Sequence, residues 1–330
     1  MRFLIFILQF NLILPQLLMA SQKCQNTVSD QTLTDGITNA KIEVSSYAQP
    51  NARTLDTILV SLGSGAIRYI SQLKPGSVVI DSGSGFSIAS AQLAIKKMKV
   101  FAINAQNAWE YFSLMLNQNP NDPKVKKIIA VAISDLGVSI KGTDLKTKNN
   151  GHGPWVDIDN AKSKDLRTVG LRLLDKLRGL FESGHFNYVV NFSDIFLKTT
   201  ENAADLIIDN WGAIFYSPNR TLLFDSYFKT LKPGGKAFLK IRDSYGHGVI
   251  DEVIIKSGKT NYKISLIEYL VENYPDIFSV DNYRSTLIIK KTHQNQKLNL
   301  QAILKKQSEE KGEMNNGTFP IVTWEFINTP

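Results

Sequence analysis

Hydrophobic and polar positions along the chain alternate between two periods, short apolar runs typical of buried strands and the three-and-four spacing of helices. Strand-like and helix-like segments follow one another between residues 54 and 291, which predicts crossover units and a mostly parallel sheet with helices on both faces. In chain order we expect a helix over 54–73, strand 77–80, helix 87–98, strand 99–104, helix 108–118, strand 126–134, helix 164–184, strand 186–192, helical patches over 200–210 and 219–231, strand 231–241, helix 263–274, and strands 277–283 and 285–291.

The last two expected strands are joined by a short connection around the residues DNYR, 281–284, so we expect them to pair antiparallel. The predicted fold is therefore α/β and Rossmann-like: a seven-strand sandwich with one antiparallel strand. A Lys-, Asn- and Gly-rich insertion lies near 141–159, and its GHGPW segment is a candidate lid.

The polar stretches around this core suggest four parts. Residues 21–51 are polar and are expected to form an N-terminal arm, residues 52–291 the domain, and residues 292–330 a polar C-terminal tail. Residues 1–20 carry Arg2, an apolar centre and a small-residue exit, as a secretory signal peptide does. The expected location is secreted or periplasmic, and the alternative is an uncleaved membrane anchor.

Composition narrows the classes of protein. Cys24 is the only cysteine, which excludes an internal disulfide and any Cys-rich zinc or iron–sulfur site. The formal net charge of +8 comes from lysines that are scattered rather than arranged in a basic stripe, so there is no strong nucleic-acid signature. The four histidines have no acidic partner at ligand spacing, and we expect no metal.

The segment SVVIDSGSGFSIAS, residues 77–90, carries the main candidate site. Asp81 ends a predicted strand, and Gly83 and Gly85 form the turn into the next helix. Glycine permits positive φ and close approach of the backbone to a ligand, and the helix that follows presents free N–H groups. A dinucleotide site needs a third glycine at position 88, which is Ile88 here.

A second motif accompanies the first. LKPGGKAFL, residues 231–239, turns into an apolar strand about 150 residues later. The pattern D-x-G-x-G after the first strand and L-K-P-G-G before the fifth resembles the class I S-adenosylmethionine-dependent methyltransferases over roughly residues 52–291. The resemblance implies a seven-strand methyltransferase sandwich, S-adenosyl-L-methionine as cofactor, and a methyl acceptor of unknown class as partner.

The same resemblance implies roles for single residues. Asp81, Gly83, Ser84 and Gly85 would line the methionine end of the cofactor. At position 87 the family usually has a third glycine, and this chain has Ser87.

Three further positions complete the implied cofactor site. Asn104, at the end of the second strand, stands where the family has an acid that binds the ribose hydroxyls. Asp135, after the expected strand over 126–134, would receive the adenine amino group. Asn191 would end the fourth strand, where cofactor and substrate meet.

Two residues are candidates for catalysis. Asp194 lies beside the expected fourth strand, although a helix N-cap explains it equally. Lys240 lies near the end of the fifth strand, where ribose-methylating RNA enzymes carry a catalytic Lys together with an Asp after strand four and a Glu near the last strand. No Glu occurs in NYRSTLII, and a solvated Lys is the simpler interpretation.

Three functions follow from the sequence. The first is an exported methyltransferase that uses S-adenosylmethionine. The second is a non-catalytic binding protein on a degenerate methyltransferase fold, which Asn104 and Ser87 favour. The third, a nicotinamide-dependent oxidoreductase, is disfavoured by the missing third glycine and by LKPGG.

Overall fold

The structure is a computed structural model of the chain. It describes residues 31–34, 41–44, 52–104, 107–149, 154–190, 193, 197, 200–217, 219–242, 251–257, 260–281, 285–298, 300, 302–311 and 318–326. The segment 1–20, expected to be a signal peptide or anchor, lies outside these ranges. Among the described residues, no helix has the length and apolar character needed to cross a membrane.

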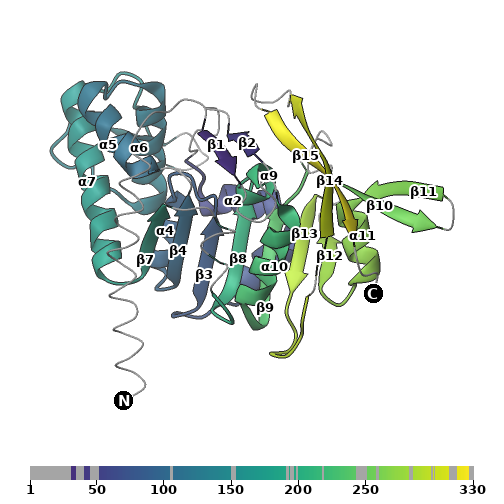
Figure 1. Ribbon diagram of the computed structural model, residues 1–330. Coiled ribbons are helices and arrows are strands. Elements are labelled where there is room, and N and C mark those ends of the chain that lie inside the picture. The colour runs from purple at the N-terminus through teal and green to yellow at the C-terminus, as the bar shows by residue number, and fades with distance from the viewer. Residues whose placement is uncertain are drawn as a thin grey trace, which may run out of the picture.

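A seven-stranded sheet forms the centre of the protein (Figure 1). Every neighbouring pair in it is parallel except the two that involve β13, which runs antiparallel to both β12 and β9. This confirms the Rossmann-like class and the single antiparallel strand. In spatial order the strands are β12 (Phe278–Asp281), β13 (Thr286–Lys290), β9 (Leu231–Lys240), β8 (Ala204–Asn210), β3 (Val78–Ser82), β4 (Lys99–Asn104) and β7 (Phe186–Val190).

Helices cover both faces of the sheet, as predicted. Figure 1 shows α5, α6 and α7 grouped at the β7 end. The first face packs against α2 (Leu55–Leu62), α3 (Ser64–Ser71), α4 (Ile88–Ile95), α5 (Ala108–Gln118), α6 (Pro123–Leu136) and α7 (Ser163–Glu182). The second face packs against α9 (Ala213–Tyr216), α10 (Arg220–Thr230) and α11 (Leu266–Asn273).

Successive residues of each central strand point to opposite faces, which gives two hydrophobic cores. In β8, Leu206 and Ile208 join the core beneath α2–α7, whereas Ile207 joins the core beneath α9–α11. In β3, Val79 and Ile80 divide in the same way. Both faces are buried, so these strands read as continuous apolar runs rather than as an alternating pattern.

Three smaller sheets accompany the central one. A four-stranded sheet has the order β11 (Thr260–Ser265), β10 (Glu252–Ser257), β15 (Thr318–Phe326), β14 (Ala302–Lys311). Two hairpins are formed by β1 (Gln31–Thr34) with β2 (Lys41–Val44) and by β5 (Thr147–Asn149) with β6 (Pro154–Val156). Part of the expected C-terminal tail is therefore folded: Phe326 stacks on Tyr269 of α11 with ring centroids 4.4 Å apart.

The segment 126–134, expected to be a strand, is helical because it belongs to α6. Asp122 caps this helix by accepting from Lys124 N, Pro123 occupies its first turn, and Gly137 ends it with φ 62°. These are ordinary start and stop signals of a helix. The buried residues follow helical spacing: Val125, Ile128, Ile129, Ala132 and Leu136.

The expected helical patch over 200–210 is also wrong, because residues 204–210 form the central strand β8. Its run of Leu206, Ile207 and Ile208 is short, partly β-branched and buried on both sides, which favours a strand. One expected strand is helical and part of one expected helix is a strand, so the sheet still has seven strands. The segment FNYVV is consequently the third strand of the sheet along the chain, and β8 is the fourth.

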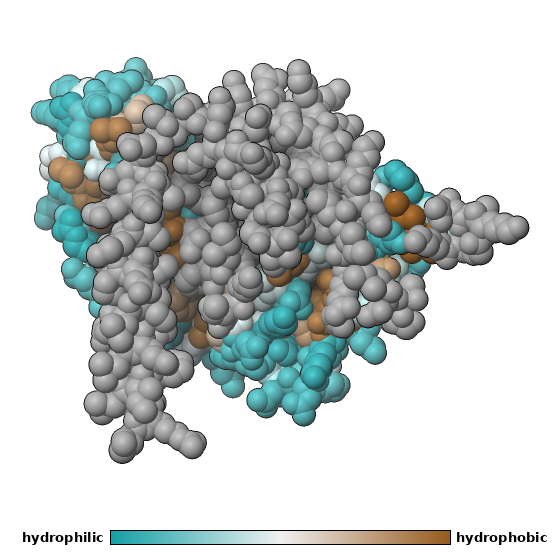
Figure 2. All heavy atoms as spheres, in the orientation of Figure 1, coloured by the Kyte–Doolittle hydropathy of each residue, from teal (hydrophilic) through white to brown (hydrophobic). Residues whose placement is uncertain are grey.

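On the face that Figure 2 shows, the described residues are mostly hydrophilic, and hydrophobic residues appear among them where α5–α7 lie and elsewhere. The exposed large hydrophobic side chains of these helices are Leu114, Leu171 and Phe181. Isolated residues of this kind are normal on a soluble surface and require no partner.

One buried ion pair joins the helices of the second face to β10. Arg220 Nη1 lies 2.5 Å from Asp251 Oδ1, and both side chains are almost completely buried. The same guanidinium donates through Nε to the carbonyl of Ile214 (2.6 Å) and through Nη2 to that of Phe215 (3.1 Å). Arg220 thereby satisfies carbonyl groups of the short helix α9.

Replacing Asp251 with Ala leaves the Arg220 charge buried without its carboxylate, so we expect the free energy of unfolding to fall by about 3–5 kcal/mol. The matched control is Asp175→Ala, because Asp175 pairs with Arg178 at 3.1 Å where both side chains are about two-thirds exposed. We expect that loss to stay below about 1 kcal/mol. Denaturant unfolding measures both, and equal losses would contradict the prediction.

Candidate functional site

The candidate site lies at the carboxyl ends of β3 and β8. From β3 the sheet grows outward through β4 and β7 on one side and through β8 and β9 on the other. The connections after β3 and β8 therefore diverge, and such a switch point is where open α/β sheets bind ligands. The glycine turn predicted from the sequence occupies this position.

The turn over 83–87 has an unusual backbone. Gly83 and Gly85 have φ of 76° and 57°, and Ser87 has φ 54° in the left-handed region. The N–H groups of Gly83 and Ser84 both donate to the carbonyl of Ile103, at 2.9 and 3.0 Å, so they are occupied by β4. Residues 83–85 keep partial exposure while their neighbours are buried. Position 87 needs the conformation that glycine adopts most easily, and Ser87 adopts it at some cost in strain.

Gly83 packs directly against the loop that follows β8. A Cβ on Gly83 would collide with the Cα of Gly212, and a Cβ on Gly212 would lie 2.8 Å from the Cα of Gly83 and 2.8 Å from Asp209 Oδ1. Both positions therefore require glycine. The loops after β3 and β8 therefore pack backbone against backbone, and this contact forms the base of the candidate site.

Asp81 lies beneath the turn on the face covered by α4. Its carboxylate is buried, and Ser90 of α4 donates to Oδ2 at 2.5 Å. Burial raises the pKa of Asp81 to about 6, although the Ser90 hydroxyl and the charge of Arg53 act in the opposite direction. The structure thus places Asp81 beside the turn as predicted, as a buried support.

Asp209 is a second buried acid, and the sequence analysis missed it. It accepts hydrogen bonds from Gly212 N (2.9 Å), Ile214 N (2.8 Å) and the Tyr227 hydroxyl (2.7 Å). Burial raises its pKa to about 7, against the effect of these three donors, and the nearby Asp81 raises it further. The signal was present in the sequence: LIID repeats the pattern VVID, an apolar strand that ends in an acid.

Asn104 lies next to the glycine turn, because the preceding residue, Ile103, holds that turn through its carbonyl. Its Nδ2 donates to the Tyr188 hydroxyl at 3.2 Å, and the same oxygen accepts from Ala108 N at 3.1 Å. Desolvation raises the pKa of Tyr188 to about 12, so it stays a neutral hydroxyl. The amide of Asn104 is thus oriented by β7 and by the start of α5.

Lys240 ends β9, as predicted, and its side chain is buried. Nζ donates to the carbonyl of Ser61 (2.9 Å) and to Ser285 Oγ (3.1 Å), and the Ser61 hydroxyl donates to Asn210 Oδ1 (3.0 Å). These contacts tie α2 and the residue before β13 to the ends of β8 and β9. They give Lys240 a positioning role, and its catalytic role stays a prediction.

The structure does not support the predicted role of Asp135, and two other predicted residues lie outside the described part of the chain. Asp135 lies in the last turn of α6, where its Oδ2 accepts from Ser134, so the strand on which its adenine role depended does not exist. Asn191 follows the third strand of the sheet rather than the fourth, and both Asn191 and Asp194 lie outside the described residues. The residues that end the fourth strand are Asp209 and Asn210.

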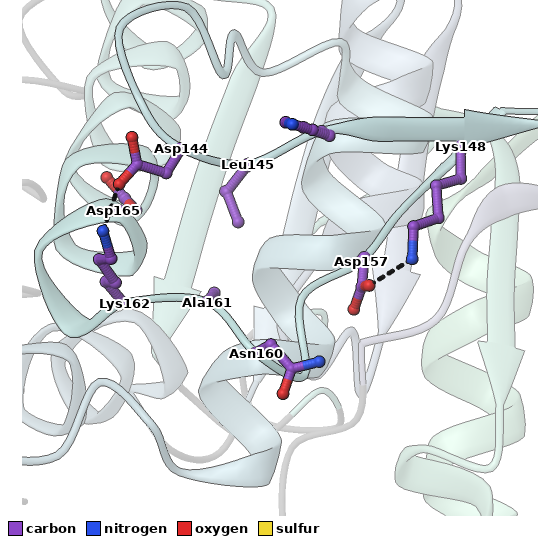
Figure 3. A pocket seen from close by; sticks show the side chains of 9 residues that line it. Asp144, Leu145, Lys148, Asp157, Asn160, Ala161, Lys162 and Asp165 are labelled. Carbon is purple, nitrogen blue, oxygen red and sulfur yellow. Dashed lines mark hydrogen bonds and ion pairs between the residues drawn. The ribbon is translucent and has the colours of Figure 1, made fainter.

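A small pocket lies between the β5–β6 hairpin and the start of α7 (Figure 3). Ion pairs cross its walls, Lys148 to Asp157 at 2.5 Å and Lys162 to Asp144 at 2.7 Å. Its volume of about 180 Å³ is below the roughly 300–1,000 Å³ of small-molecule sites. None of the predicted site residues lines it, and in the described part of the chain no group of three or more His, Cys, Asp and Glu side chains is arranged to hold a metal ion.

No protein-family profile and no curated protein matches this chain. The similar proteins are solved structures. Phosphoethanolamine N-methyltransferase 2 from Haemonchus contortus, in complex with S-adenosyl-L-methionine, is 13% identical over 58% of this chain and 29% of its own, with a TM-score of 0.31. The chain thus spans less than a third of that protein.

Two further solved structures are similar at the same level. Burkholderia thailandensis 1,6-didemethyltoxoflavin-N1-methyltransferase is 9% identical over 79% of this chain and 76% of its own, with a TM-score of 0.33. Geranyl diphosphate C-methyltransferase from Streptomyces coelicolor A3(2) is 13% identical over 55% and 46%, with a TM-score of 0.29. The strand order and the single antiparallel strand define the fold class: this chain has a Rossmann-like, seven-stranded α/β sandwich.

The buried acids predict how stability depends on pH. Asp81 and Asp209 have pKa values of about 6 and 7, above the ordinary value of 3.8, so the folded state holds protons that the unfolded chain releases. The free energy of unfolding therefore falls as the pH rises from about 4 through 7, and the contribution is complete below that range. We expect Asp81→Asn to reduce this fall by on the order of 2–3 kcal/mol.

Denaturant unfolding at pH 4 and at pH 7 measures the effect, and Asp175→Asn on the exposed surface is the control. Parallel curves for Asp81→Asn and the unsubstituted protein would contradict the assignment.

Proposed function

We propose that the protein is a methyltransferase that uses S-adenosyl-L-methionine. The observation that carries the proposal is the partly exposed turn 83–85, held at the switch point by the carbonyl of Ile103 and by the contact with Gly212. The glycines on either side of Ser84 let the protein backbone approach a cofactor closely.

The proposed cofactor fits residues from two adjacent strands. The turn from Gly83 to Gly85, fixed by the hydrogen bonds of its first two N–H groups to Ile103, would line the methionine end, with Asp81 beneath it as a support. Asn104 would hold the ribose, with its amide oriented by Tyr188. When bound, S-adenosylmethionine supplies a sulfonium methyl group for displacement by a nucleophile of the acceptor.

A second candidate is a binding protein that has lost the cofactor, which Asn104 and Ser87 favour. Asn offers one neutral acceptor oxygen where an acid would make charge-assisted contacts to two hydroxyls. Ser87 adopts a left-handed φ of 54°, which a glycine would adopt without strain. Cofactor binding distinguishes the two candidates.

We expect calorimetric titration to show micromolar binding of S-adenosylmethionine and of its demethylated product. Asn104→Asp restores the acid, and the difference between a neutral and a charge-assisted hydrogen bond corresponds to roughly tenfold tighter binding. Tyr188 remains a partner, because its hydroxyl can donate to the new carboxylate.

The matched control is Asn295→Asp, which adds the same charge at an exposed position in the turn after β13. We expect no change in affinity there. An absence of binding at millimolar ligand, with Asn104→Asp equally inactive, would overturn the proposal and leave the binding protein.

We also propose that the protein is exported, on the basis of residues 1–20, with membrane anchoring as the alternative. Export predicts that the mature N-terminus begins near residue 21. Mass spectrometry of the protein from its native host measures this directly. A mature chain that retains residues 1–20 would contradict cleavage and favour the anchor.

A further inference from the structure

Trp211, the residue directly after β8, has a backbone conformation that its type rarely adopts. Its φ is 61°, in the left-handed region where bulky side chains are genuine outliers. Strain of this kind persists only where the surrounding structure enforces it, and it gathers at ligand sites. The residue stands at the switch point, between Asn210 at the end of β8 and Gly212 against the glycine turn.

The surroundings of Trp211 enforce this conformation from both sides. Asp209 accepts from the N–H groups of Gly212 and Ile214, so its carboxylate bridges the turn in which Trp211 lies. Gly212 is fixed in turn by its contact with Gly83. The strained backbone therefore follows from the same interactions that build the cofactor turn.

The side chain of Trp211 leans toward α9. Its indole stacks on Phe215 with centroids 4.5 Å apart and planes 22° apart, while Phe215 is buried. This stack uses one face of the indole. Trp211 keeps part of its surface exposed, and in the described part of the chain its indole N–H has no hydrogen-bond partner.

We propose that Trp211 binds the methyl acceptor, and that the acceptor carries a planar aromatic group which stacks on the indole face opposite Phe215. This inference rests on the proposed function, since it names the substrate class of the same site. The buried Phe215 fixes the plane of the indole, so a third ring extends an existing stack without further ordering. A flat ring with a nucleophilic substituent would then lie beside the turn expected to hold the sulfonium.

The probes are 2-naphthol and its saturated counterpart decahydro-2-naphthol, which share a hydroxyl and differ in planarity. Each is titrated by NMR into the full chain saturated with S-adenosylhomocysteine and, separately, into the chain without it. We expect 2-naphthol to bind and the saturated ring to bind at least roughly tenfold more weakly. Adenosine, tested with the cofactor site filled, shows whether a nucleobase is accepted as readily as a phenol.

Trp211→Asn removes the ring but keeps a residue that tolerates left-handed φ, so we expect 2-naphthol affinity to fall about tenfold. Trp211→Phe keeps a stacking face and should stay within roughly threefold. If Trp211→Asn fails to fold in a thermal melt, Trp211→Gly removes the ring with no backbone strain. The control is Phe181→Ala, which deletes an exposed aromatic residue of α7 and should change nothing.

Equal binding of the two probes, unchanged affinity in Trp211→Asn, or no binding of 2-naphthol at all would overturn the inference. Failure of the proposed function is distinguishable, because it appears as absent binding of S-adenosylhomocysteine. In that case, 2-naphthol binding that depends on Trp211 in the chain without S-adenosylhomocysteine would still support an aromatic-binding site. Only the proposed methyl transfer would then be rejected.

Discussion

The contact between Gly83 and Gly212 is the constraint on which the candidate site depends. Strands β3 and β8 are neighbours, and the loops that leave them meet with no room for a Cβ on either glycine. This close contact between the two glycines fixes the position of the glycine turn relative to the sheet. It also fixes the start of the loop after β8, which is why Asp209 must hold two of that loop's N–H groups and why Trp211 has a left-handed backbone.

The alternation of side chains along the strands divides the polar residues of this edge into two sets. The first set points toward the core beneath α2–α7 and comprises Asp81, Asn210 and Lys240. Asp81 bonds to Ser90, whereas Asn210 and Lys240 both bond to Ser61. The second set, Ser82 and Asp209, points toward the opposite core, and both side chains form hydrogen bonds with the Tyr227 hydroxyl. The site is therefore supported from both layers of helices, and each layer contributes its own hydrogen bonds to the loops.

Specific partners partly offset the cost of burying polar groups near this edge, although burial still raises the pKa of Asp209. A buried carboxylate is costly unless donors satisfy it, and Asp209 has three. The Arg220–Asp251 pair serves the adjacent helix α9, whose carbonyls it also binds. These networks hold rigid a region that carries backbone strain at Ser87 and Trp211. Rigidity of this kind is what a preorganised ligand site requires.

The sequence by itself determined the fold class, the glycine turn after β3, the place of Lys240 at the end of β9, and the antiparallel last pair, because each rests on local chemistry. Each of these features, an apolar run, a glycine at positive φ or a four-residue connection, is a property of a short segment of the chain. Tertiary structure decided that residues 204–210 take the central position in the sheet, whereas the run 126–134 is helical under local caps that the sequence itself contains. Period alone cannot separate a short buried strand from a helix, since burial on both sides erases the pattern. The same decision placed Asp209, rather than Asp135, near the end of a sheet strand, and it packed the loop that follows β8 against Gly83, which is far away in the sequence.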